Sequence, residues 1–169
     1  MKKGRVVALI AVVAVVAIQL YRPAKTNPHE DATKTLPAST QVPADVAQTL
    51  DRSCSDCHTY RTVWPKYSYV APVSWLITDD VNEGRRHVNF SDWASYSLER
   101  QQRRLGEICD EVTDGGMPLR QYTWMHKGTA LDQQQRDAIC AWTKAEQQRI
   151  TARTGVQVPQ PKQGGMHGQ

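Results

Sequence analysis

Three side chains suited to covalent and metal chemistry lie within five consecutive positions. Two residues separate Cys54 from Cys57, and His58 follows at once. Thiols at this spacing can add across two vinyl groups on one porphyrin edge, while the adjacent imidazole offers a nitrogen ligand to iron. C-x-x-C-H is the attachment signature of c-type haem. The sequence therefore predicts one covalently bound haem c as cofactor, with Cys54, Cys57 and His58 as its binding residues.

Other kinds of site also use closely spaced cysteines. A zinc site would need a second close pair of ligands, and Cys109 and Cys140 are single and far apart. A thioredoxin-like motif would need a strand leading into a helix, and no strand pattern is sustained. A disulfide between Cys54 and Cys57 would leave His58 unexplained. Haem accounts for all three residues of the motif.

A haem iron bound by His58 also requires a hydrogen-bond partner for that histidine and a second axial ligand. The second ring nitrogen of His58 should donate a hydrogen bond to a backbone carbonyl, which we expect near Pro65 or Pro72. On the opposite side we expect Met117 as the second metal ligand, because Pro118 restricts its backbone on a loop between helices. The alternative for Met117 is an ordinary buried methionine. The other candidates, interpreted as packing, surface or tail residues, are Met125, Met166, His87, His126 and His167.

The remaining two cysteines lie on the apolar faces of two predicted helices. In an oxidising compartment, a disulfide between Cys109 and Cys140 would stabilise the fold by about 3 kcal/mol through loop entropy. The alternative is two buried thiols that pack as small hydrophobic residues. We expect the disulfide.

The N-terminus carries a targeting or anchoring signal. Two lysines and an arginine precede the stretch from Val6 to Leu20, which is apolar except at Gln19. This run of about 15 residues is shorter than the roughly 20 of a full membrane span. No A-x-A cleavage site occurs near its end, and the best candidate, Val15–Ala17, lies early, inside the run. We expect an uncleaved signal anchor in residues 1–21, with a cleaved signal peptide as the alternative. Either places the remaining chain outside the cytoplasm.

Composition then divides the rest of the chain. Residues 22–41 are rich in Pro, Thr and Lys and predict a linker, and residues 151–169 predict a disordered tail. Between them, apolar residues recur at helical spacing. We expect helices over residues 44–52, 73–84, 98–113 and 133–149.

Two of these helices carry more specific expectations. In the second, we expect Trp75, Leu76 and Val81 to face inward. In the last, Asp132 followed three residues later by Gln135 predicts a capping box.

Length and charge limit the class of protein. A chain of 169 residues that is 40% hydrophobic fits one small domain, which we place at residues 42–150. The net charge is +4 and the basic residues are scattered among acids, so we expect no nucleic-acid partner. No Ser/His/Asp constellation, paired carboxylates or phosphate-binding glycine loop stands out. We expect an all-α domain that is not an enzyme by itself.

Several motifs together resemble the bacterial haem-binding domain family and, more broadly, class I cytochromes c. The resemblance covers about residues 42–148. It implies a small cytochrome c-like helical domain around one haem, with an N-terminal membrane anchor on the periplasmic side. The motifs that carry it are Cys54–His58, Trp64–Ser68, Ala71–Leu76, Asp80–Arg85, Asn89–Trp93 and Met117–Leu119. The chain departs from the usual family residues at Lys66, at Gly115 or Gly116, and at Lys127.

These observations favour a membrane-tethered, mono-haem c-type cytochrome domain that passes single electrons between redox partner proteins not identified by the sequence. Ligation by His58 and Met117 raises a reduction potential and closes the iron to small molecules. The alternatives are a peroxidase-like enzyme or a small-gas sensor, both with a displaceable sixth ligand, and a haemless domain held by disulfides. Arg85 or Arg86 offers a partner for a haem propionate, against a plainer role at the surface.

Overall fold

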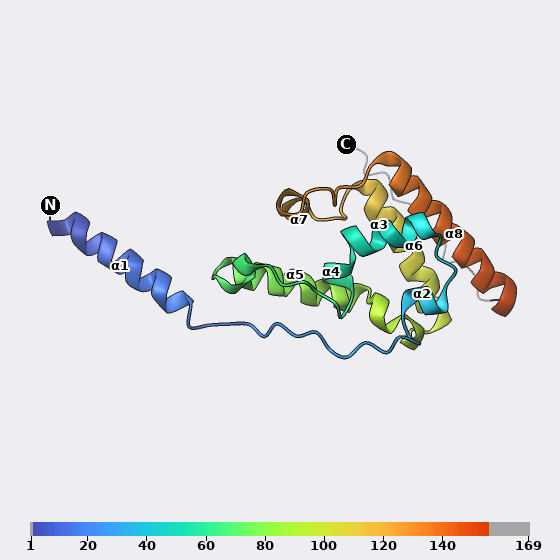
Figure 1. Ribbon diagram of the computed structural model, residues 1–169, viewed down its shortest axis with the longest axis horizontal. Helices are drawn as coiled ribbons and strands as arrows, with labels where there is room; N and C mark the ends of the chain where they lie inside the picture. Colours follow the sequence, from blue (N-terminus) through green and yellow to red (C-terminus); the bar gives the residue numbers. More distant parts are fainter. Residues whose placement is uncertain (1, 156–169) are drawn as a thin grey trace, which may run out of the picture. The chain divides into compact units, whose positions relative to one another are not determined.

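The computed structural model describes residues 2–155 (Figure 1). Within these residues the chain forms helices joined by turns and contains no strand, which confirms the all-α class. The chain divides into two compact units. The first comprises the N-terminal residues to Glu30 together with Ser55–Ser91, and the second comprises Asp31–Cys54 together with the residues from Asp92 onward. The predicted domain range of residues 42–150 thus contributes to both units.

The second unit is built around two long helices. Its core contains the fully buried side chains of Leu105 and Ile139, and Trp93 and Trp142 are also among the least exposed of the described residues. Its helical segments are α2 (Leu36–Ser39), α3 (Ala44–Ser53), α6 (Leu98–Asp114), α7 (Arg120–Met125) and α8 (Gln133–Thr154), with part of the 3-10 segment η2 (Phe90–Ser95). Most of its packing lies between α6 and α8, and α3 also rests on α8.

Local sequence signals determine where these helices begin and end. The Asp132 side chain accepts from the Gln135 backbone and the Gln135 side chain accepts from the Asp132 backbone, so the predicted capping box is confirmed. Gly115 ends α6 with a φ of 76°, a left-handed conformation that favours glycine. Between the helices, the buried amide of Gln102 donates to the Gln147 carbonyl at 3.0 Å, and the Gln147 amide donates back to the Gln102 carbonyl at 2.8 Å. A buried amide must find such partners, and this pair joins α6 to α8.

The first unit is smaller and surrounds α5. Its segments are α1 (Lys2–Ile18), α4 (Ser55–His58), the 3-10 helix η1 (Lys66–Tyr69) and α5 (Val73–His87). Both α4 and η1 pack against α5. The buried face of α5 consists of Ser74, Thr78, Val81 and Gly84.

The inward residues expected for α5 need correction. Val81 is buried as predicted, whereas Trp75 is only half-buried and Leu76 is 53% exposed. The buried face also includes the small residues Ser74, Thr78 and Gly84, and at Gly84 the backbone of Cys57 approaches the helix closely. The apolar pattern alone therefore identified the buried face of this helix only in part.

The expected linker of residues 22–41 is also more structured than its composition suggested. The Asn27 side chain donates to the Thr62 carbonyl at 2.8 Å, and the Arg85 guanidinium donates to the Thr26 carbonyl at 2.7 Å. Further along, Leu36 is 1% exposed and begins α2. Polar side chains and backbone carbonyls fix a segment that has few large apolar residues of its own.

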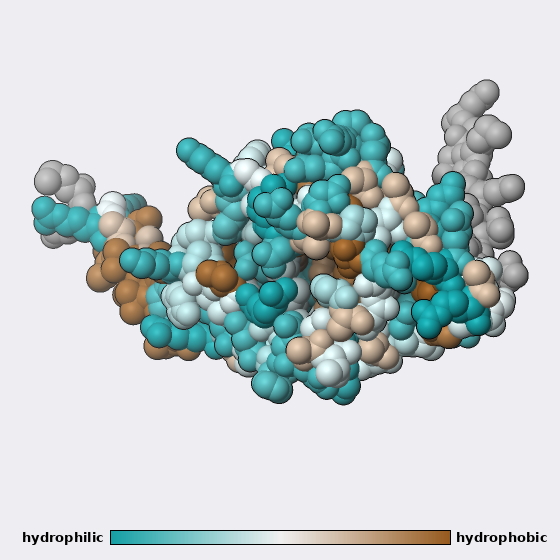
Figure 2. Space-filling model, turned by 45° about the vertical axis from the view of Figure 1, so that its right-hand side comes forward, coloured by the Kyte–Doolittle hydropathy of each residue, from teal (hydrophilic) through white to brown (hydrophobic). Residues whose placement is uncertain are grey.

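Both ends of the described chain are helical. Helix α8 continues to Thr154 and Gly155 caps it, so residues 151–154 of the expected tail are helical. Met166 and His167 lie outside the described residues. The side chains of α1 are exposed and apolar over most of its length, and Figure 2 shows their surface uncovered. Among residues 2–155, no helix has the length and apolar character needed to cross a membrane.

Candidate functional site

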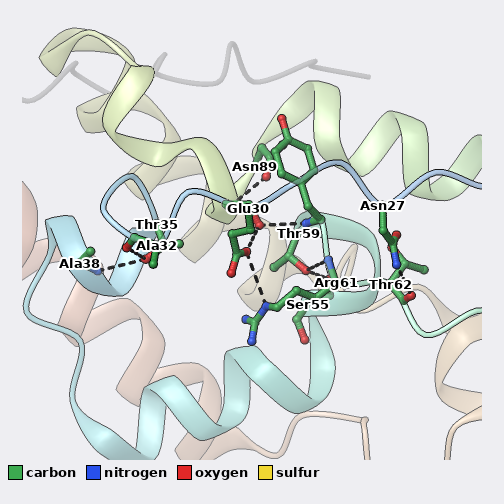
Figure 3. Close-up of polar contacts among 12 residues, drawn as sticks. Asn27, Glu30, Ala32, Thr35, Ala38, Ser55, Thr59, Arg61, Thr62 and Asn89 are labelled. Atoms are coloured by element: carbon green, nitrogen blue, oxygen red, sulfur yellow. Dashed lines mark hydrogen bonds and ion pairs between the residues drawn. The ribbon is translucent and has the colours of Figure 1, made fainter.

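The predicted motif begins at the end of α3 and continues through the short helix α4. Cys54 caps α3, with its backbone N–H donating to the Leu50 carbonyl at 2.9 Å, and α4 begins at the next residue. The hydroxyl of Thr59 donates to the Ser55 carbonyl at 2.7 Å, as Figure 3 shows, and so closes the single turn of α4. Cys57 and His58 therefore stand on a rigid turn.

The imidazole of His58 is oriented by the carboxyl end of α5. Its Nδ1 lies 2.9 Å from the Val88 carbonyl oxygen and 3.1 Å from the Gly84 carbonyl oxygen. Because both partners accept hydrogen bonds, Nδ1 carries the proton and donates. The lone pair of Nε2 is then the one that can bind a metal. The expectation of a carbonyl near Pro65 or Pro72 is wrong, because the end of α5 lies closer to the ring.

A close approach between backbones places α4 on α5. A Cβ atom added to Gly84 would lie 2.6 Å from the carbonyl oxygen of Cys57, a separation that side chains do not tolerate. Glycine is therefore required at this position for steric reasons. On the other side of the imidazole, the buried ring of Phe90 stacks on His58 with centroids 5.6 Å apart.

Burial sets the protonation states of the motif. It raises the pKa of the Cys57 thiol to about 12, helped by the negative charges of Asp80 and Asp56. Burial also lowers the pKa of His58, against the two hydrogen bonds to backbone carbonyls. At neutral pH the cysteine is a thiol and the imidazole is neutral, which is the form that coordinates iron.

Arg85 holds the residues that follow the motif. Its Nε donates to the Thr59 carbonyl at 2.8 Å, and Nη2 donates to the Thr62 hydroxyl at 2.8 Å and the Asn27 side-chain oxygen at 3.0 Å. With Nη1 on Thr26, all three nitrogens bond to protein, which gives Arg85 a structural role, and a haem propionate partner for Arg85 or Arg86 stays a prediction. Its structural role was missed because the partners lie far apart in sequence.

A second polar cluster fastens the same loop. Ser91 donates through its hydroxyl to the Glu30 carboxylate and accepts from the Tyr60 backbone N–H at 2.8 Å. Arg61 places its Nε 3.6 Å from the same carboxylate. Figure 3 shows the Glu30 carboxylate directed toward Arg61, and Asn27 against Thr62. The loop after α4 is thereby held on two sides by the segment that follows α1.

The predicted second ligand, Met117, belongs to the other unit. It is half-buried on the loop after α6, and its backbone N–H donates to the Glu111 carbonyl at 3.0 Å. Its sulfur is thus carried on a backbone tied to the end of α6. His58 lies in the first unit, so its pairing with Met117 through iron stays a prediction.

The other candidate ligands within the described residues have different surroundings. Met125 is 58% exposed on α7. His126 stacks on Tyr122 with ring centroids 4.2 Å apart. His87 is exposed and lies 3.5 Å from the Glu83 carboxylate. These positions fit the packing and surface roles expected for them.

The cysteines differ in their chemical state. Cys109 and Cys140 form a disulfide between α6 and α8, with their Cα atoms 4.7 Å apart. Cys54 and Cys57 are thiols. The pairing is the one expected from the sequence, and it leaves the motif cysteines available for chemistry.

The imidazole of His58 is anchored through Nδ1 and shares the turn of α4 with the Cys57 thiol, three residues after Cys54 in an all-α fold, and this donor set is of the type that binds haem. The donor set fits this cofactor, because the lone pair of His58 Nε2 is not used by the Nδ1 hydrogen bonds and would be available to bind iron. Residues 13–145 match the family described as Haem-binding domain. The chain belongs to this family, and the assignment supports haem as its cofactor. No curated protein and no solved structure gives a significant match.

Proposed function

We propose that the chain is a mono-haem c-type cytochrome domain that carries single electrons. In this proposal the thiols of Cys54 and Cys57 add across the two haem vinyl groups, each forming a carbon–sulfur and a carbon–hydrogen bond, and His58 binds iron. The observation that carries it is the hydrogen bonding of His58 Nδ1 to the carbonyls of Gly84 and Val88. These bonds fix the ring and increase the basicity of Nε2.

Met117 provides the second ligand in the proposal. A thioether sulfur raises the reduction potential and keeps small molecules from the iron. Bound haem supplies an iron that changes oxidation state by one electron. A closed site of this kind suits electron transfer between redox partner proteins more than catalysis, so the domain would be a carrier and not an enzyme by itself.

The same proposal places the domain at the outer face of the bacterial cytoplasmic membrane. The exposed apolar run of α1, which follows the basic residues at the beginning of the same helix, supports a membrane anchor. The disulfide between Cys109 and Cys140 supports an oxidising compartment, the periplasm. A tether there raises the effective concentration of the domain near membrane-bound partners.

Absorption spectra of the holoprotein test this function. The full chain would be made in cells with cytochrome c maturation, and the ferric and ferrous forms recorded. We expect a c-type spectrum with the weak near-infrared band of methionine bound to iron. Met117→Ala should abolish this band. The matched control, Met125→Ala, should keep it, because Met125 is exposed on α7.

Two spectroscopic results would contradict the proposed function. A c-type spectrum without the methionine band, shifting readily with carbon monoxide or cyanide, would indicate an open site and favour a peroxidase-like enzyme or a gas sensor. A spectrum without haem absorption would contradict the proposal altogether.

A further inference from the structure

An exposed apolar patch lies where α1 meets the first turns of α5. Its members are 43% to 85% exposed, the extremes being Val73 and Leu20. Isolated exposed apolar residues are ordinary, but a contiguous group marks an interaction surface. The patch consists of Leu20, Tyr21, Tyr69, Val70, Val73 and Leu76.

Specific contacts join the two sides of this patch. The Gln19 amide donates to the Ala71 carbonyl at 3.1 Å, and the Ala71 backbone N–H donates to the Gln19 side-chain oxygen at 2.9 Å. The indole N–H of Trp75 donates to the Tyr21 carbonyl at 3.0 Å, and the Tyr21 and Trp75 rings meet edge to face at 5.8 Å. The start of α5 is therefore fixed directly beside the end of the apolar α1.

The charged residues around the patch have a particular order. Arg22 and Lys25 follow the apolar run at once, and the Lys25 ammonium lies 4.5 Å from the centre of the Tyr69 ring. Acidic residues, Asp79 and Asp80, begin one turn beyond Leu76 on α5. Apolar residues bordered by tyrosine, tryptophan and basic side chains are typical of a segment at the lipid–water interface.

We propose that this patch rests in the surface of a lipid bilayer containing anionic lipids. The inference depends on the proposed membrane anchoring by α1, because the patch continues the apolar surface of that helix. A lipid surface fits both the apolar side chains and the flanking cations, which attract anionic headgroups. A protein partner would have to cover the same residues directly beside an inserted helix.

A patch at the lipid surface would also set the distance of the haem motif from the membrane. The segment from Gln19 to Glu30, here called the strap, follows α5 from Ala71 at its start to Arg85 near its end, and Figure 1 shows it running beside that helix. At about 1.5 Å per residue, α5 rises about 20 Å between these ends. His58 is bound at the far end, through Gly84 and Val88. Helix α5 therefore spaces the motif about 20 Å along its axis from the lipid surface.

Photo-crosslinking to lipid tests the proposal. The full chain would carry Val73→p-benzoylphenylalanine and be reconstituted into vesicles of phosphatidylethanolamine and phosphatidylglycerol. A second probe, Leu76→p-benzoylphenylalanine, guards against a local folding defect. The control is Asn82→p-benzoylphenylalanine, which puts the same group at an exposed position on the same helix. After illumination, phospholipid adducts are counted by mass spectrometry, and anchoring is checked by sedimentation after an alkaline carbonate wash.

The proposal expects the chain in the washed membrane pellet, with several-fold more lipid adducts at positions 73 and 76 than at 82. Equal yields at all three positions in pelleted protein would overturn the lipid-facing patch and leave the anchor intact. Protein in the supernatant would overturn the anchor and the patch together. The two failures are thus distinguishable.

Discussion

The Nδ1 atom of His58 lies 2.9 Å from the carbonyl oxygen of Val88, the residue that caps the carboxyl end of α5. Carbonyls at this end of a helix lack partners within the helix and carry its negative partial charge. The imidazole N–H donates to the Val88 carbonyl, and this hydrogen bond fixes the orientation of the ring. The end of one helix therefore positions the imidazole carried by another.

The first prediction concerns the close contact between α4 and α5 at Gly84. Gly84→Ala should lower the free energy of unfolding by about 1–3 kcal/mol, the usual cost of overpacking, because the new methyl group would meet the Cys57 carbonyl. It should also reduce the yield of haem-loaded protein, since His58 bonds to the same turn of α5. Denaturant titration and the ratio of haem absorbance to protein measure the two effects.

A matched glycine serves as control. Gly106→Ala places its methyl group 3.3 Å from the end of the flexible Gln147 side chain and within the interior of α6. Alanine is favoured over glycine in a helix by about 0.5–1 kcal/mol. Haem loading in this variant should be unchanged. Equal loss of haem in both variants would show that the approach of Gly84 to Cys57 has no special role.

The second prediction concerns how much the hydrogen bonds of Arg85 contribute to stability. Arg85→Ala removes donors to Thr59, Thr62 and the strap, and should destabilise the protein by about 2 kcal/mol. Arg85→Lys should recover little of this, because an ammonium cannot reproduce the planar set of donors. Arg86→Ala breaks only a surface pair with Glu83 and should change stability by about 0.5 kcal/mol or less. Unfolding midpoints in urea compare the three, and full stability in Arg85→Lys would contradict the geometric argument.

The third prediction concerns the stability that the disulfide between Cys109 and Cys140 provides. Replacing both cysteines, as Cys109→Ser with Cys140→Ser, should lower stability by about 3 kcal/mol through the added freedom of the unfolded chain. The unmodified protein in strong reductant should unfold at the same denaturant concentration as the double variant. Complete alkylation of these cysteines without reductant would show that the bond is absent from the protein in solution.

Local signals in the sequence predicted a good part of this fold. The capping box at Asp132, the glycines after α6 and the helical spacing of apolar residues located the long helices within a few residues. These features depend on neighbours three or four positions away, which a sequence displays directly. Helix α7 and the last turn of α8 were not predicted, because their residues carry weak apolar patterns.

The geometry of the site depended on contacts that sequence cannot display. The carbonyls that hold His58 come from 26 and 30 residues later, and any residue type could have supplied them. Arg85 binds Thr26, 59 residues earlier, although nothing in its own neighbourhood marks it. Gly84 was the available signal: it stands at the end of the predicted run 73–84, and a glycine in a helical pattern often has a packing reason.

The central claim is that Cys54 and Cys57 hold haem covalently beside the ring of His58. The most direct test is the intact mass of the holoprotein after denaturation and acid–organic extraction. The account predicts a chain heavier by one haem, and loss of that added mass in the double variant Cys54→Ala with Cys57→Ala. A chain of unmodified mass, with the haem recovered in the extract, would contradict it.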